Sequence, residues 1–357
     1  MNRLPDQTIS HLQGILGRPN LQGTRYEYVR HIGIGGMSDV HLVYDTRLGR
    51  EVAMKVLRSE IDSEATKERM LREARILAKL DHSNIVPVYD LGTLGEERVY
   101  YTMKFLEGKT LAEYTLENTE LLDLLRVFIR VCNAVAHAHS KGVLHRDIKP
   151  ENIMLLPYGE VMVVDWGIAK AGVESSDEAN QNDFKFSSSS FTTSSTTIES
   201  TLLGTPSYCA PEIWKSVPDS GTFPPKYTIS SDIYSIGATL YYTLTGRPPL
   251  VANSFGELQR LSAGHSPPPP RTLQQEIPRP IEAICLKALS ASTQHRYTNA
   301  EHIARDLQLY LDGYEISAYK ENMLERLVRW TKRNAFIVLL LFVYVLVRIL
   351  LFFFSLL

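Results

Sequence analysis

The sequence contains few cysteines, no excess of basic residues and no apolar run near its start. Its three cysteines, Cys132, Cys209 and Cys285, lie far apart and form no CxxC pair, which excludes a disulfide framework and a zinc knuckle. Lys and Arg total 38 against 40 for Asp and Glu, so the positive charge typical of a nucleic-acid-binding protein is missing and no nucleic-acid partner is expected. Residues 1–24 are polar and lack the apolar core of a signal peptide. These absences indicate a globular protein of the reducing cytosol.

The pattern of residues changes at about residue 26, after a short polar extension at 1–25. Runs rich in β-branched and aromatic residues predict strands at 26–32, 40–45, 51–57, 85–92 and 98–105. Apolar residues at helical spacing predict a helix over 63–80, with Ser63 as its N-cap. From Leu121 onward the chain is mainly helical in pattern. The sequence therefore predicts a small β-rich lobe followed by a larger helical lobe.

A glycine cluster lies between the first two predicted strands, and a lysine lies on the third. The cluster reads Gly33-Ile34-Gly35-Gly36-Met37-Ser38-Asp39-Val40, and Lys55 ends the run Val52-Ala53-Met54-Lys55. Glycines let backbone N–H groups approach phosphates closely, and a strand-borne ammonium can reach the same phosphates. Glu73, on the predicted helix, is the best counter-ion for Lys55. By itself Glu73 would be read as part of a solvated helix face.

Three further motifs follow in a fixed order. They are His145-Arg146-Asp147-Ile148-Lys149-Pro150-Glu151-Asn152, then Asp165-Trp166-Gly167, then Ala210-Pro211-Glu212. With the glycine cluster and Lys55, they resemble the signature of the eukaryotic-type (Hanks-type) Ser/Thr protein kinases, in particular the bacterial membrane-associated branch. The resemblance covers a domain at 26–312. It implies an α+β, bilobal protein-kinase fold with a β-rich N-lobe that carries one long helix and a larger helical C-lobe.

The resemblance implies a role for each motif residue. Asp147 would accept the proton of the attacking hydroxyl, and Lys149 would neutralise the γ-phosphate of ATP. Asn152 and Asp165 would supply oxygen ligands to Mg²⁺, for which Mn²⁺ is a candidate substitute. The residues expected to bind ATP are Ile32, Gly33, Ile34, Gly35, Gly36, Met37, Ser38, Asp39, Val40, Ala53, Lys55, Glu73, Met103 and Met154. Among them, Val40 and Ala53 would hold the adenine from above, Met154 from below, and Met103 is at the gatekeeper position.

Other residues are expected to position the site. By resemblance, Asp232 would brace the catalytic loop and Arg296 would pair with Glu212. Lys149 and Gly204-Thr205-Pro206 have the forms found in Ser/Thr kinases, and Thr205 belongs to the substrate platform. Arg146 directly before Asp147 is typical of kinases whose activation loop is ordered by a phosphate.

The expected activation loop, about 168–203, contains an unusual Ser/Thr-rich run. Twelve of the fifteen residues at 187–201 are Ser or Thr, so this stretch contains little apolar surface to bury. Autophosphorylation is expected there, with Thr196, Thr197, Ser200 and Thr201 as candidates; the alternative is an inert insertion. Three departures from the family pattern are Ser38 in place of the third loop glycine, Trp166 in place of Phe, and the long interval from Asp165 to Glu212. They affect regions expected to govern substrate docking and activation control.

The last segment, 335–357, contains 21 apolar residues interrupted by Arg348 and Ser355. As a helix it would extend about 34 Å, enough to cross a hydrocarbon core of about 30 Å. The preceding linker, 313–334, is rich in basic residues, which by the positive-inside rule places the kinase domain on the cytoplasmic side. The alternative is a buried core helix. The expected location is the cell membrane, with a single pass, as either a tail-anchored enzyme or a shortened homologue of a longer receptor kinase.

The sequence therefore predicts an ATP-dependent Ser/Thr protein kinase that phosphorylates proteins in signalling and is anchored in the lipid bilayer. A membrane-tethered pseudokinase scaffold is the main alternative, although Lys55, Asp147, Asn152 and Asp165 are all present. A small-molecule phosphotransferase is a third reading, against which Ala210-Pro211-Glu212 argues. Formation of a homodimer is a hypothesis only.

Overall fold

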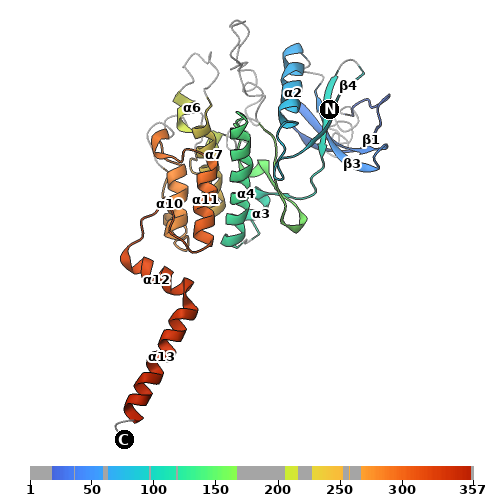
Figure 1. Ribbon diagram of the computed structural model, residues 1–357. Coiled ribbons are helices and arrows are strands. Elements are labelled where there is room, and N and C mark those ends of the chain that lie inside the picture. The colour runs from blue at the N-terminus through green and yellow to red at the C-terminus, as the bar shows by residue number, and fades with distance from the viewer. Residues whose placement is uncertain are drawn as a thin grey trace, which may run out of the picture.

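The computed structural model describes residues 18–35, 37–58, 63–95, 98–117, 120–166, 206–215, 227–251, 257 and 267–354. They form two lobes and a C-terminal extension (Figure 1). The smaller lobe contains the main sheet and one helix, and the larger lobe is built from helices that lie side by side. The predicted α+β, bilobal arrangement is confirmed.

A five-stranded antiparallel sheet forms the smaller lobe. Its strands are β1 (Tyr26–Ile34), β2 (Ser38–Asp45), β3 (Arg50–Leu57), β4 (Val88–Leu94) and β5 (Arg98–Lys104), in the order β1-β2-β3-β5-β4. All five predicted strands are present. The fourth begins at Val88 rather than residue 85, because Ile85 instead forms an isolated bridge with Val163 of the larger lobe.

Helix α2 (Glu64–Leu77) packs against β5 and β4 of this sheet. Ser63 is its N-cap, as predicted, and forms a capping box with Thr66. The helix ends at Leu77 rather than at residue 80. Its buried face consists of Met70, Glu73, Ala74 and Leu77, so one carboxylate is buried among apolar side chains and requires a partner.

The larger lobe packs around two long helices, α4 (Leu121–Ser140) and α7 (Ile229–Thr245). Helix α4 packs against α11 (Ala300–Leu311), and α7 packs against α10 (Arg279–Ala288). The shorter helices are α3 (Leu111–Thr115), α6 (Pro211–Lys215) and α9 (Pro270–Leu273). The lobe also contains a small sheet of β6 (Lys109–Thr110), β7 (Ile153–Leu155) and β8 (Val161–Val163). The 3-10 turns are Pro150–Asn152, Pro157–Gly159, Pro206–Tyr208 and Thr293–His295.

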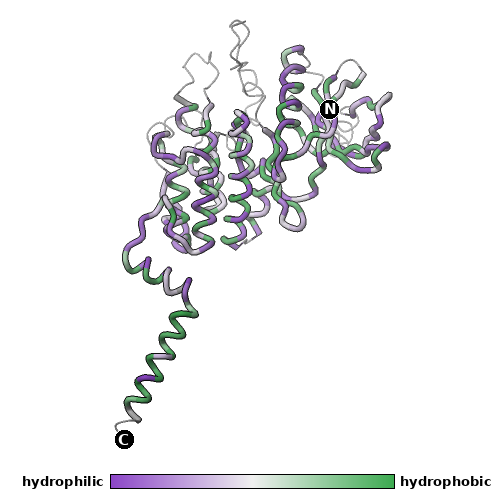
Figure 2. The backbone as a smooth tube through the Cα atoms, in the orientation of Figure 1, coloured by the Kyte–Doolittle hydropathy of each residue, from purple (hydrophilic) through white to green (hydrophobic). Residues whose placement is uncertain are grey.

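Two helices follow the larger lobe: α12 (Met323–Arg333) and α13 (Ala335–Phe354). Helix α12 lies within the segment that the sequence analysis treated as a linker. Helix α13 projects away from the lobes and is mostly hydrophobic along its length (Figure 2). Arg348 is its one charged residue. The mean hydropathy of Ala335–Phe352 is 2.9, and none of that window is buried. By length and composition α13 can cross a membrane.

Candidate active site

One face of the five-stranded sheet collects several of the residues predicted to bind ATP. Val40 is paired with Lys55 in the β2–β3 register. In the β3–β5 register Ala53 is paired with Met103, and Lys55 with Tyr101. Directly opposed residues share a face, and so do alternate residues of one strand. Val40, Ala53, Lys55, Tyr101 and Met103 therefore line the same surface of the sheet.

Lys55 on this face is paired with the buried carboxylate of α2. Its Nζ lies 2.7 Å from Glu73 Oε1 and 3.8 Å from Asp165 Oδ1. Burial disfavours the ammonium, but Tyr101, Glu73 and Asp165 outweigh that effect and raise the pKa of Lys55 above its usual value. Lys55 is therefore a fixed positive charge that connects the sheet, α2 and the Asp165 loop of the larger lobe.

Tyr101 is a site residue that the sequence reasoning missed. Its hydroxyl donates to Glu73 Oε1 at 2.7 Å, on the same oxygen that contacts Lys55. Burial raises the pKa of Tyr101, so the hydroxyl stays protonated and remains a donor. The signal was present in the sequence, because Tyr101 is two residues before Met103 on one strand and so shares its face.

The glycine cluster forms the turn between β1 and β2. Gly33 is paired with Val40 and Ile34 with Asp39, while Ile32 lies half-buried on β1 and Ile34 is exposed. The Gly35 N–H donates to the Ser38 carbonyl oxygen at 2.7 Å. A Cβ on Gly35 would lie 3.0 Å from that oxygen, so a larger residue would crowd this close turn.

Ser38 itself is buried at the start of β2. The adjacent Met37 carbonyl accepts from the Arg58 N–H at 3.1 Å, and Asp39 Oδ1 lies 3.8 Å from Arg58 Nε. The serine that replaces a family glycine is therefore part of the strand rather than of the open turn.

The loop after α4 holds Asp147 in a defined orientation. Asn152 Nδ2 donates to Asp147 Oδ2 at 3.0 Å and to the Asp147 carbonyl at 2.8 Å. Lys149 Nζ lies 3.0 Å from the same Oδ2. The side-chain nitrogen of Asn152 is used for these bonds. The side-chain oxygen of Asn152, Oδ1, is therefore the atom that would bind a cation. Met154 follows on β7, opposite Met162.

Asp232, near the start of α7, supports this loop from below. Its buried carboxylate accepts from the backbone N–H groups of His145 at 2.8 Å and Arg146 at 2.9 Å. His139 Nε2 lies 2.8 Å from Asp232 Oδ2, a contact that the sequence reasoning did not foresee. Arg146 has a φ of 68°, which a non-glycine residue adopts only when its surroundings hold it there. The two bonds to Asp232 provide that support.

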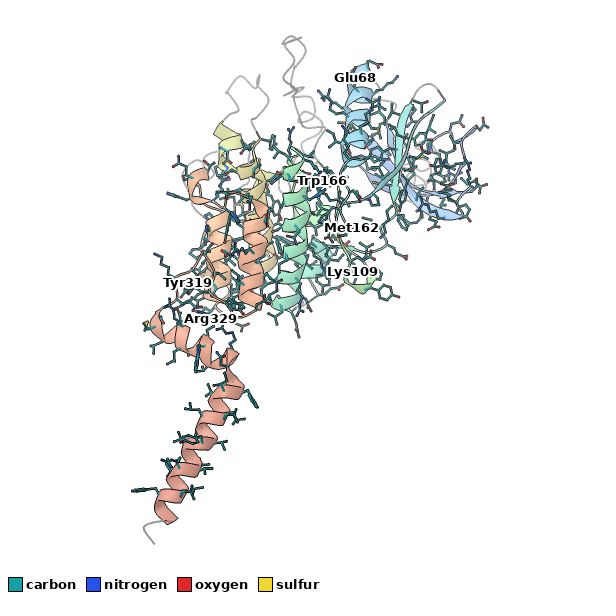
Figure 3. All side chains as sticks on the ribbon, viewed as in Figure 1. Glu68, Lys109, Met162, Trp166, Tyr319 and Arg329 are labelled. Carbon is teal, nitrogen blue, oxygen red and sulfur yellow. The ribbon has the colours of Figure 1, made fainter. Side chains whose placement is uncertain are left out.

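Asp165 and Trp166 lie next to this loop, below the sheet. Asp165 has a φ of 52°, and its side chain is 60% exposed. Trp166 is buried, with its ring centroid 4.6 Å from that of His145, and its indole N–H donates to the Val163 carbonyl (labelled in Figure 3). Burial lowers the pKa of His145 and so favours its neutral ring. The tryptophan packs inward while Asp165 remains accessible.

Arg296 forms the larger lobe's buried ion pair with Glu212 of α6. Two guanidinium nitrogens donate to the two carboxylate oxygens, each at 2.7 Å. The same guanidinium also donates to the backbone carbonyls of Ser290 and Ser230. Since the Arg296 side chain is fully buried, the pair fixes α6 to the start of α7.

The acidic and amide oxygens of the cleft fit a magnesium–nucleotide complex better than a dedicated metal cage. Within the ranges that the structure describes, no cluster of three or more His, Cys, Asp or Glu residues could hold a metal. Mg²⁺ in nucleotide sites is bound by one or two protein oxygens together with the phosphates. The exposed Asp165 carboxylate and the Asn152 carbonyl oxygen meet that requirement.

Several predicted residues lie outside the described part of the chain. They are Gly36, Gly167, Thr196, Thr197, Ser200, Thr201 and Thr205. The structure therefore says nothing about the candidate phosphorylation sites or the Thr205 part of the substrate platform.

Comparison with known proteins identifies the family. The model of the protein kinase domain matches residues 26–307. The chain belongs to the protein kinase family. A serine/threonine-protein kinase PknD of Protochlamydia amoebophila is 37% identical to this kinase over 310 residues, covering 82% of this chain and 30% of that protein. A PknD of Chlamydia caviae is 35% identical over 305 residues, covering 81% and 31%. The kinase spans about a third of the length of these curated relatives.

Solved structures agree on the fold. The crystal structure of the Mycobacterium tuberculosis PknI kinase domain matches with a TM-score of 0.56 and 21% sequence identity, covering 80% of this kinase and 95% of that chain. The PknI match supports the bilobal fold, whereas the chlamydial relatives support the Ser/Thr class.

Proposed function

We propose that this kinase transfers the γ-phosphate of ATP to Ser or Thr hydroxyls of proteins. The observation that carries the proposal is the convergence of two clusters. Lys55, Glu73 and Asp165 join the lobes at one side of the cleft, and Asp147, Lys149 and Asn152 are held together in the loop beside it. The printed names of the chlamydial relatives, which are serine/threonine-protein kinases, agree with this class of acceptor.

The described residues suit the steps of phosphoryl transfer. The Asp147 carboxylate, oriented by Asn152, would accept the proton of the attacking hydroxyl. Lys149, at 3.0 Å from Asp147, would neutralise charge on the transferred phosphate. Lys55, fixed by Glu73 and Tyr101, would hold the α and β phosphates. Val40, Ala53 and Met103 would pack on the adenine, with Met154 on the opposite side.

Asn152 and Asp165 are the residues that would hold Mg²⁺. Bound there, the ion supplies neutralisation of the phosphate charge. The Asp165 side chain is exposed enough to bind the ion. Its backbone has a positive φ, and its carboxylate lies beside Lys55. The Asn152 amide donates to Asp147, so this ligand and the proposed base are fixed together.

The proposal is tested with the full chain in detergent, radiolabelled ATP and generic protein acceptors. We expect label on phosphoserine and phosphothreonine, and its loss in Lys55→Met. Label that appears only on phosphotyrosine would contradict the Ser/Thr assignment. Label that persists in Lys55→Met would contradict the site assignment. Transfer to no protein would favour a scaffold or a small-molecule phosphotransferase.

We also propose autophosphorylation within the Ser/Thr-rich run 187–201. Thr196, Thr197, Ser200 and Thr201 are the candidate acceptors, and Arg146 is the candidate partner for a phosphate. The Arg146 guanidinium lies over the Tyr227 ring, 5.5 Å from the ring centroid. Phosphopeptide mapping of the wild type against Asp147→Asn is the test. Phosphate retained by the variant would contradict self-modification.

The third part of the proposal is anchoring in a membrane through α13, with the kinase domain on the cytoplasmic side. Support comes from the exposure and hydropathy of Ala335–Phe352 and from the basic residues that precede it. Arg348 would cost about 2.5–3.5 kcal/mol at the bilayer centre. The neighbouring Leu, Phe, Val and Ile residues offset this cost at a few tenths of a kcal/mol each. Carbonate extraction of cell membranes tests it: a chain released into the soluble fraction would contradict anchoring.

Two copies held in one membrane would meet more often, and we propose dimerisation as a consequence of anchoring. A specific activity that rises with the surface density of the kinase in vesicles is the expected result. A specific activity independent of density would contradict it.

A further inference from the structure

Helix α12 has two unlike faces. Its apolar side chains, Met323, Leu324, Leu327, Val328 and Trp330, follow helical spacing and are all exposed, from 47% for Trp330 to 80% for Met323. Its charged side chains lie on the opposite side of the helix. A contiguous exposed apolar face of this kind normally marks an interaction surface.

The charged face of α12 holds the base of the larger lobe. Glu325 accepts from the Tyr319 hydroxyl at 2.9 Å and from Arg279 of α10 at 3.3 Å. Arg329 donates to Glu321 at 2.7 Å and to the Gly313 carbonyl at 3.3 Å. Figure 3 shows Tyr319 and Arg329 where α12 meets the lobe. The apolar face is therefore turned away from the kinase domain.

The segment between α11 and α12 is also fixed. The buried carboxylate of Asp306 accepts from the backbone N–H of Ser317 at 2.9 Å and of Ala318 at 3.2 Å, and from the Tyr297 hydroxyl at 2.8 Å. Ile316 is buried between these contacts. Helix α12 is thus attached to the domain by a bonded segment rather than by a free linker.

Helix α13 limits where α12 can be. Helix α12 ends at Arg333, Asn334 breaks the helix, and the apolar run begins at Ala335. If α13 spans a bilayer, the last turn of α12 must lie at the membrane surface. Helix α12 lies across the end of α13 instead of continuing its axis (Figure 1), so its whole length, about 16 Å, remains near that surface.

We infer that α12 is an interfacial helix that inserts its apolar face at the boundary of headgroups and acyl chains in an anionic bilayer. The inference rests on the proposed anchoring through α13. Residues 320–333 contain five basic and two acidic residues, and this excess of positive charge attracts anionic headgroups. Trp330 is the residue type that favours this boundary.

This arrangement sets the orientation of the kinase. The polar face of α12 contacts the larger lobe, and the smaller lobe lies farther from α12 than the larger lobe does (Figure 1). With α12 seated in the bilayer, the base of the larger lobe rests on the membrane.

The test compares adjacent positions of α12 in the full chain. The variants are Leu327→Cys and Arg326→Cys. The replaced residues are nearly equally exposed, 57% for Leu327 and 54% for the Arg326 side chain, so the two positions differ mainly in the face of α12 on which they lie. Leu346→Cys reports insertion of α13. Each variant is labelled with an environment-sensitive fluorophore and reconstituted in vesicles of equal phosphatidylcholine and phosphatidylglycerol. The unmutated chain gives the background from the native cysteines, and melting temperatures confirm that each variant folds.

We expect nitroxide-labelled lipid to quench the label at 327 at least about threefold more strongly than the label at 326, with the reverse order for aqueous iodide. If lipid quenches the label at 346 while iodide quenches the label at 327, the inference is overturned and anchoring through α13 stands. A 327 label shielded from both quenchers would assign the face to a second copy and also overturn it. Iodide quenching at both 327 and 346 would overturn anchoring together with the inference.

Discussion

Two ion pairs in this kinase join the same kinds of group in different surroundings. Lys55 and Glu73 meet at 2.7 Å in the cleft, with side chains 14% and 4% exposed. Arg326 and Glu315 meet at 3.5 Å near α12, with side chains 54% and 44% exposed. Water solvates the second pair whether or not it forms, but the first pair has given up its water. The comparison teaches that burial, rather than the presence of a pair, decides what its removal costs.

The largest effect is expected where the buried pair is also functional. Glu73→Gln keeps the shape of the side chain but removes the charge that holds Lys55, so kcat/KM for phosphotransfer should fall about 10²- to 10³-fold. Glu315→Gln is the matched control, and it should leave kcat/KM unchanged. Equal activity of the two variants would show that the Lys55–Glu73 contact does not serve the reaction.

A loss of stability is expected when the buried ion pair of the larger lobe, Arg296–Glu212, is broken. Glu212→Gln leaves the fully buried Arg296 guanidinium without its carboxylate, and the free energy of unfolding should fall by about 3 kcal/mol. Glu315→Gln should change it by about 0.5 kcal/mol or less. Denaturant unfolding monitored by tryptophan fluorescence measures both. A loss below about 1 kcal/mol for Glu212→Gln would contradict the role given to burial.

A buried group without partners should make stability depend on pH. His41 on β2 is 1% exposed, and neither ring nitrogen has a hydrogen-bond partner among the described residues. Burial, followed by the charges of His31 and Arg98, lowers the pKa of His41 from 6.5 to about 4. The unfolded chain therefore takes up the proton first, and the contribution of His41 is complete above pH 6.5.

That contribution should be lost as the pH falls from 6.5 to about 4, with a slope of at most about 1.4 kcal/mol per pH unit. In His41→Phe this part of the slope should disappear. Unfolding curves recorded at several pH values for both proteins are the measurement. Parallel pH dependences would mean that His41 is protonated in the folded kinase.

The smallest effect is expected at a solvent-exposed end of a helix. Ser63→Ala removes the cap of α2, whose side chain accepts from the Thr66 N–H, and should cost about 1 kcal/mol of stability. Ser63→Asp should restore most of it, because Asp also caps well. Thermal unfolding of the two variants separates loss of the cap from any other effect. A Ser63→Ala variant as stable as the wild type would show that α2 is held by packing alone.

Much of the fold followed from local pattern. Runs rich in β-branched and aromatic residues predicted the five strands, and Ser63 followed by helical spacing predicted α2, because these signals depend only on neighbouring residues. The motif residues were identified by their resemblance to the protein-kinase signature, whose residue types suit phosphate chemistry. Helix α12 lies in the segment 313–334 that was predicted to be a basic linker, although Leu324, Leu327 and Val328 have helical spacing.

Other features could not be predicted because they depend on contacts distant in sequence. The positive φ of Arg146 and of Asp165 is imposed by the packing of the loops, with Asp232 bonded to one of them. His139 reaches Asp232 from another helix, and Tyr101 on β5 reaches Glu73 on α2. The strand pattern places Tyr101 on the same face as Met103, but its contact with Glu73 depends on how α2 packs against the sheet.

The central claim is that Asp147 acts on the attacking hydroxyl within a site that binds ATP through other residues. Single-turnover phosphotransfer from radiolabelled ATP, measured with ATP binding for the wild type and Asp147→Asn, tests it most directly. We predict a rate lower by about 10²- to 10⁴-fold in the variant, with ATP affinity unchanged. A variant that transfers phosphate at the wild-type rate would contradict the claim, and so would one that loses activity only because it no longer binds ATP.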